Sequence, residues 1–137
     1  MTDTNDYGAQ PFVLNIEEAT IANDKFRVAK WTGNNLQMTL MTIQPGDDIG
    51  LEVHADHDQF LRVEQGLGLV QMGSAEDNLD YEQSVEDDYA IFVPAGMWHN
   101  VTNTGDQPLK LYSIYAPSEH PRGTIHNTKA EAEAAEH

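Results

Sequence analysis

The stretch that decides the fold is GLEVHADHDQF, residues 50–60. Side chains of an extended chain point alternately to opposite faces, so Glu52 and His54 share one face and can reach the same ion. The polar residues 55–58 favour a turn that returns Gln59 on a following strand. Three potential ligands therefore converge inside strand-like sequence, where an inward-facing polar side chain requires a partner.

A second polar cluster, PAGMWHN, occupies residues 94–100. Its Pro94 and Gly96 favour a turn that places His99 at the start of a strand. Alternation along the strands predicts a mainly apolar cavity beyond the polar donors, and such a cavity selects compact ligands. We expect four residues to line this cavity: Leu61, Val63, Trp98 and Val101.

The rest of the chain is typical of an all-β protein. Short apolar runs separated by Gly, Pro, Asn or Asp predict strands at residues 26–31, 36–43, 49–54, 60–64, 67–72, 89–93, 98–103 and 109–115. Many short strands at regular spacing indicate one sandwich or barrel, over residues 11–117. Residues 73–88 contain seven acidic and no basic residues, which indicates a solvated connection.

The two ends of the chain differ from this barrel. We expect residues 1–10 to form a mobile arm, followed by a short helix over residues 16–22 that Asn15 caps. Residues 118–137 form a C-terminal extension, with a helical tail over residues 128–136 that Thr128 can cap.

The two polar clusters resemble the paired motifs of the cupin superfamily. The first motif corresponds to Gly46-(five)-Glu52-x-His54-(four)-Gln59-(six)-Gly66, and the second to Asp88-(five)-Pro94-x-Gly96-(two)-His99-(three)-Asn103. The resemblance implies a small jelly-roll-like β-barrel. It also implies that Glu52, His54, Gln59 and His99 bind one divalent metal.

Three positions depart from the usual motifs. Glu52 stands where a His is usual, Gln59 where a Glu is usual, and Asp88 where a Gly is usual. The resulting ligand set is similar to that of phosphomannose isomerases, which have Gln-x-His, Glu and His around zinc, with Glu and Gln exchanged. One carboxylate, one amide oxygen and two imidazoles suit Zn²⁺, Mn²⁺, Fe²⁺ or Ni²⁺. The alternative is a metal-free polar network that binds an organic ligand directly.

Three other histidines are weaker candidates. His57 can replace Gln59 as a ligand if the register of the turn differs. His120 and His126 follow the last predicted strand, in a segment that can fold back over a barrel edge.

The resemblance implies metal-dependent chemistry on a small polar organic molecule. Isomerisation of a sugar or a keto acid is one hypothesis, in which the metal polarises a carbonyl or enediol. A phosphorylated sugar would need Arg or Lys at the cavity, and Arg62 alternates away from Gln59. An iron- or nickel-dependent dioxygenase and a non-catalytic binding protein are the alternatives.

Composition excludes several other classes. The chain has 137 residues, 23 acidic against 7 basic, and a formal net charge of -16, which disfavours nucleic acid and anionic membranes as partners. It has no cysteine, and its first residues lack the basic and apolar regions of a signal peptide, so we expect a cytoplasmic protein. The cupin resemblance further implies a homodimer that covers open strand edges.

Overall fold

A computed structural model describes residues 3–135 of the chain. Within these residues there are nine strands and two short helices. In chain order these are α1 (Ile16–Ala22), β1 (Arg27–Thr32), β2 (Gln37–Ile43), β3 (Asp58–Gln65), β4 (Gly68–Gly73), β5 (Tyr81–Val85), β6 (Ala90–Val93), β7 (Trp98–Asn103), β8 (Leu109–Ala116), β9 (Ile125–His126) and α2 (Lys129–Ala135). No helix within these residues is long and apolar enough to span a bilayer.

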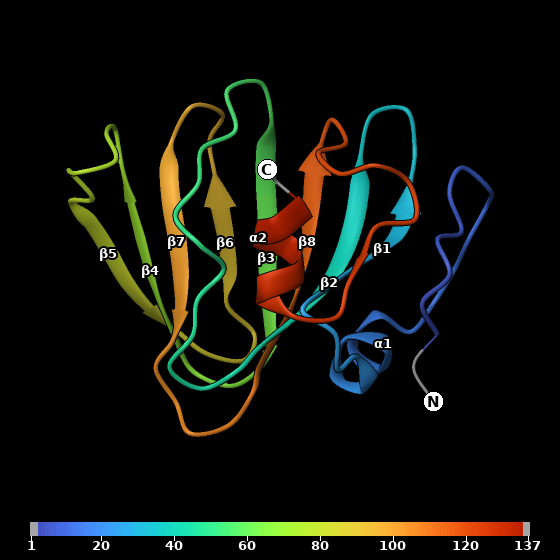
Figure 1. Ribbon diagram of the computed structural model, residues 1–137, viewed down its shortest axis with the longest axis horizontal. Helices are drawn as coiled ribbons and strands as arrows, with labels where there is room; N and C mark the ends of the chain where they lie inside the picture. Colours follow the sequence, from blue (N-terminus) through green and yellow to red (C-terminus); the bar gives the residue numbers. More distant parts are fainter. Residues whose placement is uncertain (1–2, 136–137) are drawn as a thin grey trace.

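The strands form two antiparallel sheets (Figure 1). The larger sheet has the order β6-β3-β8-β2-β1-β9, and the smaller sheet has the order β5-β4-β7. Figure 1 shows the smaller sheet at the left and the larger sheet continuing to β1 at the right. The predicted class, one all-β jelly-roll-like barrel with a helix near each end, is confirmed.

The main core lies between the two sheets. On β3, Leu61 and Val63 are fully buried, whereas Arg62 between them faces outward and pairs with Asp88 at 2.8 Å. Val101 on β7 is also buried and lies opposite Val70 of β4. The apolar alternation read from the sequence therefore assigns the inner faces of these strands correctly.

The helix α1 covers the outer face of the larger sheet. The side chain of Asn15 accepts a hydrogen bond from the backbone N–H of Glu18 at 3.0 Å, so the predicted cap is present. A second apolar cluster lies beneath the helix and includes Met38, Leu40 and Tyr112, with Leu14, Ile16, Ala19, Phe60 and Ile114 packed against them.

Two segments differ from the predicted strands. Residues 49–54 do not form a strand, because Gly50 adopts a positive φ of 92° that interrupts the extended run. This segment joins β7 through isolated bridges, including Glu52 opposite His99. The acidic segment 73–88, expected as a solvated connection, contains the strand β5. The side chains of β5 are largely exposed, so its sequence lacks a clear apolar alternation.

Both ends of the described chain lie along β1. The segment expected as a mobile arm contacts β1 through hydrogen bonds from Tyr7 N–H to the Lys30 carbonyl at 2.9 Å and from the Thr32 hydroxyl to Asp6 at 2.6 Å. Residues 1, 2, 136 and 137 lie outside the described part.

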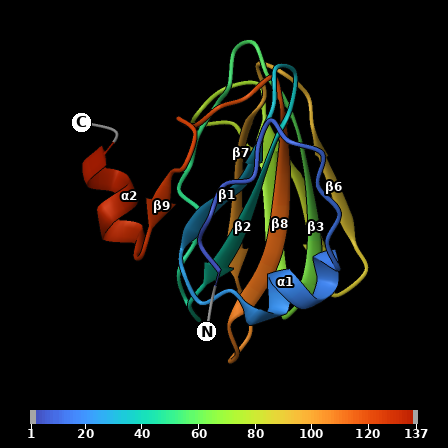
Figure 2. The ribbon, with the colours of Figure 1, turned by 90° about the vertical axis from the view of Figure 1, so that its right-hand side faces the viewer.

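The C-terminal segment returns to the barrel after β8. Its strand β9 pairs with β1, and Figure 2 shows α2 outermost on this side of the molecule. The ammonium of Lys129 pairs with Asp47 at 3.0 Å and also with Asp48, while Ala132 is buried. The predicted helical tail is thus present as α2, with Thr128 accepting a hydrogen bond from Glu131 N–H at 3.2 Å.

Candidate metal centre

Backbone pairing brings Glu52 and His99 together from distant parts of the chain. Glu52 N–H donates to the His99 carbonyl at 3.0 Å, and His99 N–H donates to the Glu52 carbonyl at 2.9 Å. The turn before β7 supports this pair, since Gly96 adopts a positive φ of 82° and donates its N–H to the His54 carbonyl at 2.8 Å. Glycine suits this conformation because it lacks a Cβ.

The side chains of Glu52, His54 and His99 converge at one point. The Glu52 Oε1 atom lies 3.3 Å from His54 Nε2 and 3.5 Å from His99 Nε2. One ligand atom from each residue lies within 4.8 Å of the others, so the group can hold a metal ion. Both histidines are buried, which isolates their nitrogens from water.

A hydrogen bond selects the ligand nitrogen of His99. Its Nδ1 lies 3.1 Å from the carbonyl oxygen of Met97, which can only accept, so Nδ1 carries the proton. Its Nε2 is the nitrogen left to bind a metal, and this buried atom has no hydrogen-bond partner among the described residues. Metal-binding histidines commonly have their other nitrogen fixed in this way.

Electrostatics keeps the Glu52 carboxylate ionised. Burial alone would raise its pKa, but the interactions of the carboxylate with His54 and His99 outweigh burial and lower the pKa of Glu52 to about 2. For His54, burial lowers the pKa, but the hydrogen bond and charge of Glu52 outweigh this effect and the net pKa is raised. The carboxylate is therefore available as a ligand at neutral pH.

Gln59, the fourth expected ligand, lies on the inner face of β3 between Tyr115 of β8 and Val93 of β6. Its amide nitrogen donates to the Ser113 hydroxyl at 2.8 Å, which fixes the orientation of the amide. The amide oxygen is buried and has no hydrogen-bond partner within residues 3–135. An orphaned buried oxygen of this kind suits a cation.

Glu119 is a site residue that sequence reasoning missed. Its Oε1 lies 3.3 Å from His54 Nδ1 and 3.1 Å from His57 Nδ1, so it contacts the side of His54 that faces away from Glu52. Gln37 holds this segment in place, because its side-chain oxygen accepts the backbone N–H of Glu119 at 3.2 Å and of His120 at 2.9 Å.

A second possible metal group follows from this contact: His54, His57 and Glu119 also bring their ligand atoms within 4.8 Å. His57, expected as an alternative to Gln59, is thus placed beside His54, with its Nε2 3.1 Å from the Ser118 carbonyl. The two groups share His54 but use its opposite nitrogens.

The other two histidines lie farther along the C-terminal segment. The His120 ring packs edge-on against Tyr115 at 5.2 Å between ring centroids, and Tyr115 packs edge-on against His54 at 5.6 Å. Burial, followed by the charge of Arg27, lowers the pKa of His120 to about 3. Burial raises the pKa of Tyr115 to about 12. Both rings are therefore neutral at neutral pH.

Three of the four expected cavity residues belong to the main core: Leu61, Val63 and Val101. Trp98 alternates with His99 along β7 and is half-buried, so its side chain projects from the opposite face of that strand. Its environment therefore differs from that of the other three.

Comparison with known proteins defines the class to which this fold and site belong. Residues 39–115 match the Cupin_2 family, described as the cupin domain. This match covers more than half of the chain, and the protein belongs to the cupin family. Cupins commonly bind a metal, and Glu52, His54 and His99 form a candidate group of metal ligands in this chain.

Three known proteins are similar to this chain over most of its length. It is 61% identical to the uncharacterized protein YrkC of Bacillus subtilis (strain 168), over 96% of this chain and 70% of YrkC. It is 37% identical to the uncharacterized protein L612 of Acanthamoeba polyphaga mimivirus, over 85% of this chain and 71% of L612. The crystal structure of BH2720 from Bacillus halodurans has 64% identity and a TM-score of 0.94, over 95% of this chain and 98% of BH2720.

Proposed function

We propose that this cupin holds one divalent transition metal at Glu52, His54, Gln59 and His99 and acts on a small polar organic molecule beside it. The observation that supports this proposal most strongly is the buried Nε2 of His99, which has no hydrogen-bond partner among the described residues and lies 3.5 Å from the Glu52 carboxylate. Zinc, manganese, iron and nickel all accept this mixed donor set.

We further propose isomerase-like chemistry on a sugar or a keto acid. When bound, the metal supplies a Lewis acid that polarises a carbonyl or enediol oxygen. The chain itself supplies a second carboxylate, Glu119, that lies on the far side of His54 and would hold this ring in position for the metal. Apolar side chains around Leu61 form the core of the barrel and would limit the access of water.

Solvent exchange tests this proposal directly. Metal-loaded protein is incubated anaerobically in D₂O with candidate keto acids and unphosphorylated sugars, and deuterium in the carbon next to the carbonyl is measured by NMR. We expect incorporation by the wild type, its loss in Glu52→Ala and slower incorporation in Glu119→Gln. Oxygen uptake in a parallel aerobic incubation, without deuterium exchange under anaerobic conditions, would favour a dioxygenase instead. Ligand binding with neither reaction would favour a non-catalytic binding protein.

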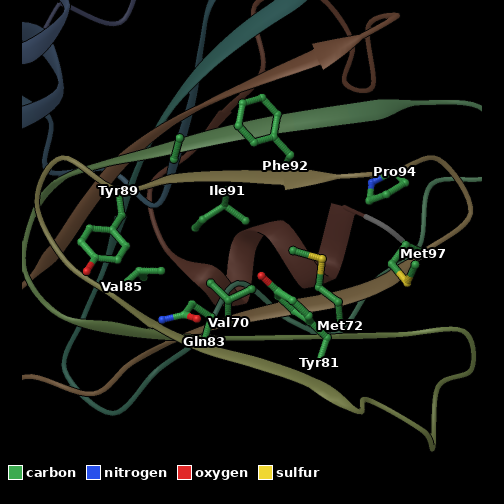
Figure 3. A pocket seen from close by; sticks show the side chains of 11 residues that line it. Val70, Met72, Tyr81, Gln83, Val85, Tyr89, Ile91, Phe92, Pro94 and Met97 are labelled. Atoms are coloured by element: carbon green, nitrogen blue, oxygen red, sulfur yellow. The ribbon is translucent and has the colours of Figure 1, made fainter.

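We also propose a cytoplasmic homodimer that pairs through open strand edges. The edge strands β5 and β6 border an apolar pocket of about 380 Å³, across which Ile91 faces Val70 and Met72 (Figure 3). Phe92 on β6 is 71% exposed, and exposed apolar edge strands favour pairing with another chain. Light scattering should give twice the mass of one chain for the wild type and a monomer for Phe92→Glu.

A further inference from the structure

Arg27 is a buried cation inside the barrel. It lies at the start of β1, opposite Met41 of β2 and His126 of β9, and its side chain is among the largest that are fully buried. Its charge acts on neighbouring groups, because after burial it is the next cause of the lowered pKa of His120 and it partly opposes the raised pKa of His54. Arg27 is therefore electrostatically part of this site.

The guanidinium of Arg27 has no anionic partner in the described chain. Its NH1 lies 3.2 Å from His126 Nδ1, and its carbon lies 5.2 Å from the centre of the Phe26 ring. Its Nε is buried and makes no hydrogen bond within residues 3–135. No carboxylate of these residues lies within 4.0 Å of it, since Glu52 and Glu119 are turned toward the histidines.

Burying the Arg27 guanidinium without an anionic partner destabilises the folded protein. Moving a charge out of water costs several kcal/mol, and the charge is normally paired when it is buried. A histidine nitrogen and an aromatic ring satisfy only part of this requirement. The uncompensated guanidinium is therefore expected to bind an anion that is not part of the chain.

The surroundings of Arg27 limit this anion to a small one. A cavity of about 60 Å³ is lined by both Arg27 and Glu52, with Lys129 and Glu133 among the other lining residues. This space accommodates a single small polar group next to Glu52, one of the candidate metal ligands. The planar guanidinium matches a planar carboxylate through two parallel hydrogen bonds. The net charge of -16 disfavours a phosphate dianion.

We propose that Arg27 binds the carboxylate of a small organic acid whose adjacent oxygen faces Glu52, His54 and His99. This inference rests on the proposed function and narrows its substrate class to small carboxylic acids, with keto acids favoured over neutral sugars. Arg27 then acts as the residue that recognises and orients the substrate.

Calorimetric titration of the monocarboxylate probes pyruvate and lactate tests the inference, with neutral acetone and inorganic phosphate as comparisons. The titrations use wild type, Arg27→Met and Arg27→Lys, each before and after metal removal by a chelator. The exposed residue Arg122 provides the control Arg122→Gln, which removes one positive charge away from the cavity. Metal content is measured separately for every preparation, so a failure of the metal proposal does not obscure the result for Arg27.

We expect both carboxylates to bind the wild type and to bind Arg27→Met about tenfold to hundredfold more weakly, with unchanged metal content and unchanged affinity in Arg122→Gln. Arg27→Lys should show an intermediate affinity, because it keeps the charge but loses the bidentate geometry. Without probe, Arg27→Met should melt at the same temperature as the wild type or higher, because it removes an unpaired buried charge.

Several results would overturn the inference. These are equal carboxylate affinities in wild type and Arg27→Met, no binding of either carboxylate to the wild type, or tighter Arg27-dependent binding of phosphate. An Arg27→Met protein that melts lower than the wild type or fails to fold would show that Arg27 has a structural role instead.

Discussion

Replacing Glu119 by glutamine tests how the C-terminal segment contributes to the metal centre. The Glu119 carboxylate lies 3.3 Å from His54 Nδ1 and 3.1 Å from His57 Nδ1. In the proposed centre, His54 Nε2 faces the metal, and Glu119 accepts the Nδ1 proton and makes the ring a stronger ligand. The Glu119→Gln variant would retain an acceptor oxygen at this position but lose the negative charge.

Removal of such a supporting carboxylate typically weakens metal binding by about 10- to 100-fold, or about 1.4 to 2.7 kcal/mol. Competition between metal-free protein and a chromophoric zinc chelator measures this difference. The matched control is Glu76→Gln, which removes the same charge from an exposed position in the β4–β5 connection. Unchanged affinity in Glu119→Gln would refute the supporting role. Complete loss of metal, with full retention in Glu52→Gln, would place the ion between His54, His57 and Glu119 instead.

Three further predictions concern stability. Leu61→Ala should lower the free energy of unfolding by about 2–5 kcal/mol in urea denaturation, because Leu61 is fully buried; a loss below about 1 kcal/mol would contradict the described core. Asn15→Ala should cost about 1 kcal/mol through loss of the α1 cap, and no change would show that the cap is energetically unimportant. His120→Phe should reduce acid sensitivity. The pKa of His120 is about 3 in the folded protein and 6.5 in the unfolded chain. Between these two values only the unfolded state binds the proton, so the free energy of unfolding falls as the pH is lowered from 6.5 to about 3. In metal-free protein, the variant should gain about 2 kcal/mol relative to wild type between pH 7 and pH 5, and an equal pH dependence would refute the burial of this ring.

Local sequence patterns were sufficient to predict most of the fold. The alternation around Leu61 and Val101 identifies inner faces, and turn residues locate most strand ends. The pattern failed where one residue changed the backbone conformation, at Gly50. It also failed for β5, an edge strand whose mostly solvent-facing residues carry no apolar signal.

The candidate site was only partly predictable for a related reason. Glu52, His54 and His99 belong to compact motifs whose spacing reflects their geometry. Glu119 reaches the site only because the chain returns after β8 and Gln37 binds its backbone, and no local pattern records this contact. Arg27 was overlooked because β1 has no exposed face at its start, so alternation does not distinguish its inward-facing side chains.

Elemental analysis of the metal content tests the proposed centre most directly. Four purified proteins are compared: wild type, Glu52→Ala, His99→Ala and His57→Ala. The proposed centre predicts about one equivalent of a divalent transition metal in the wild type and in His57→Ala, and none in Glu52→Ala or His99→Ala. Circular dichroism confirms that each variant is folded. A folded wild type that takes up no metal, or loss of metal in His57→Ala with retention in His99→Ala, would contradict the proposed centre.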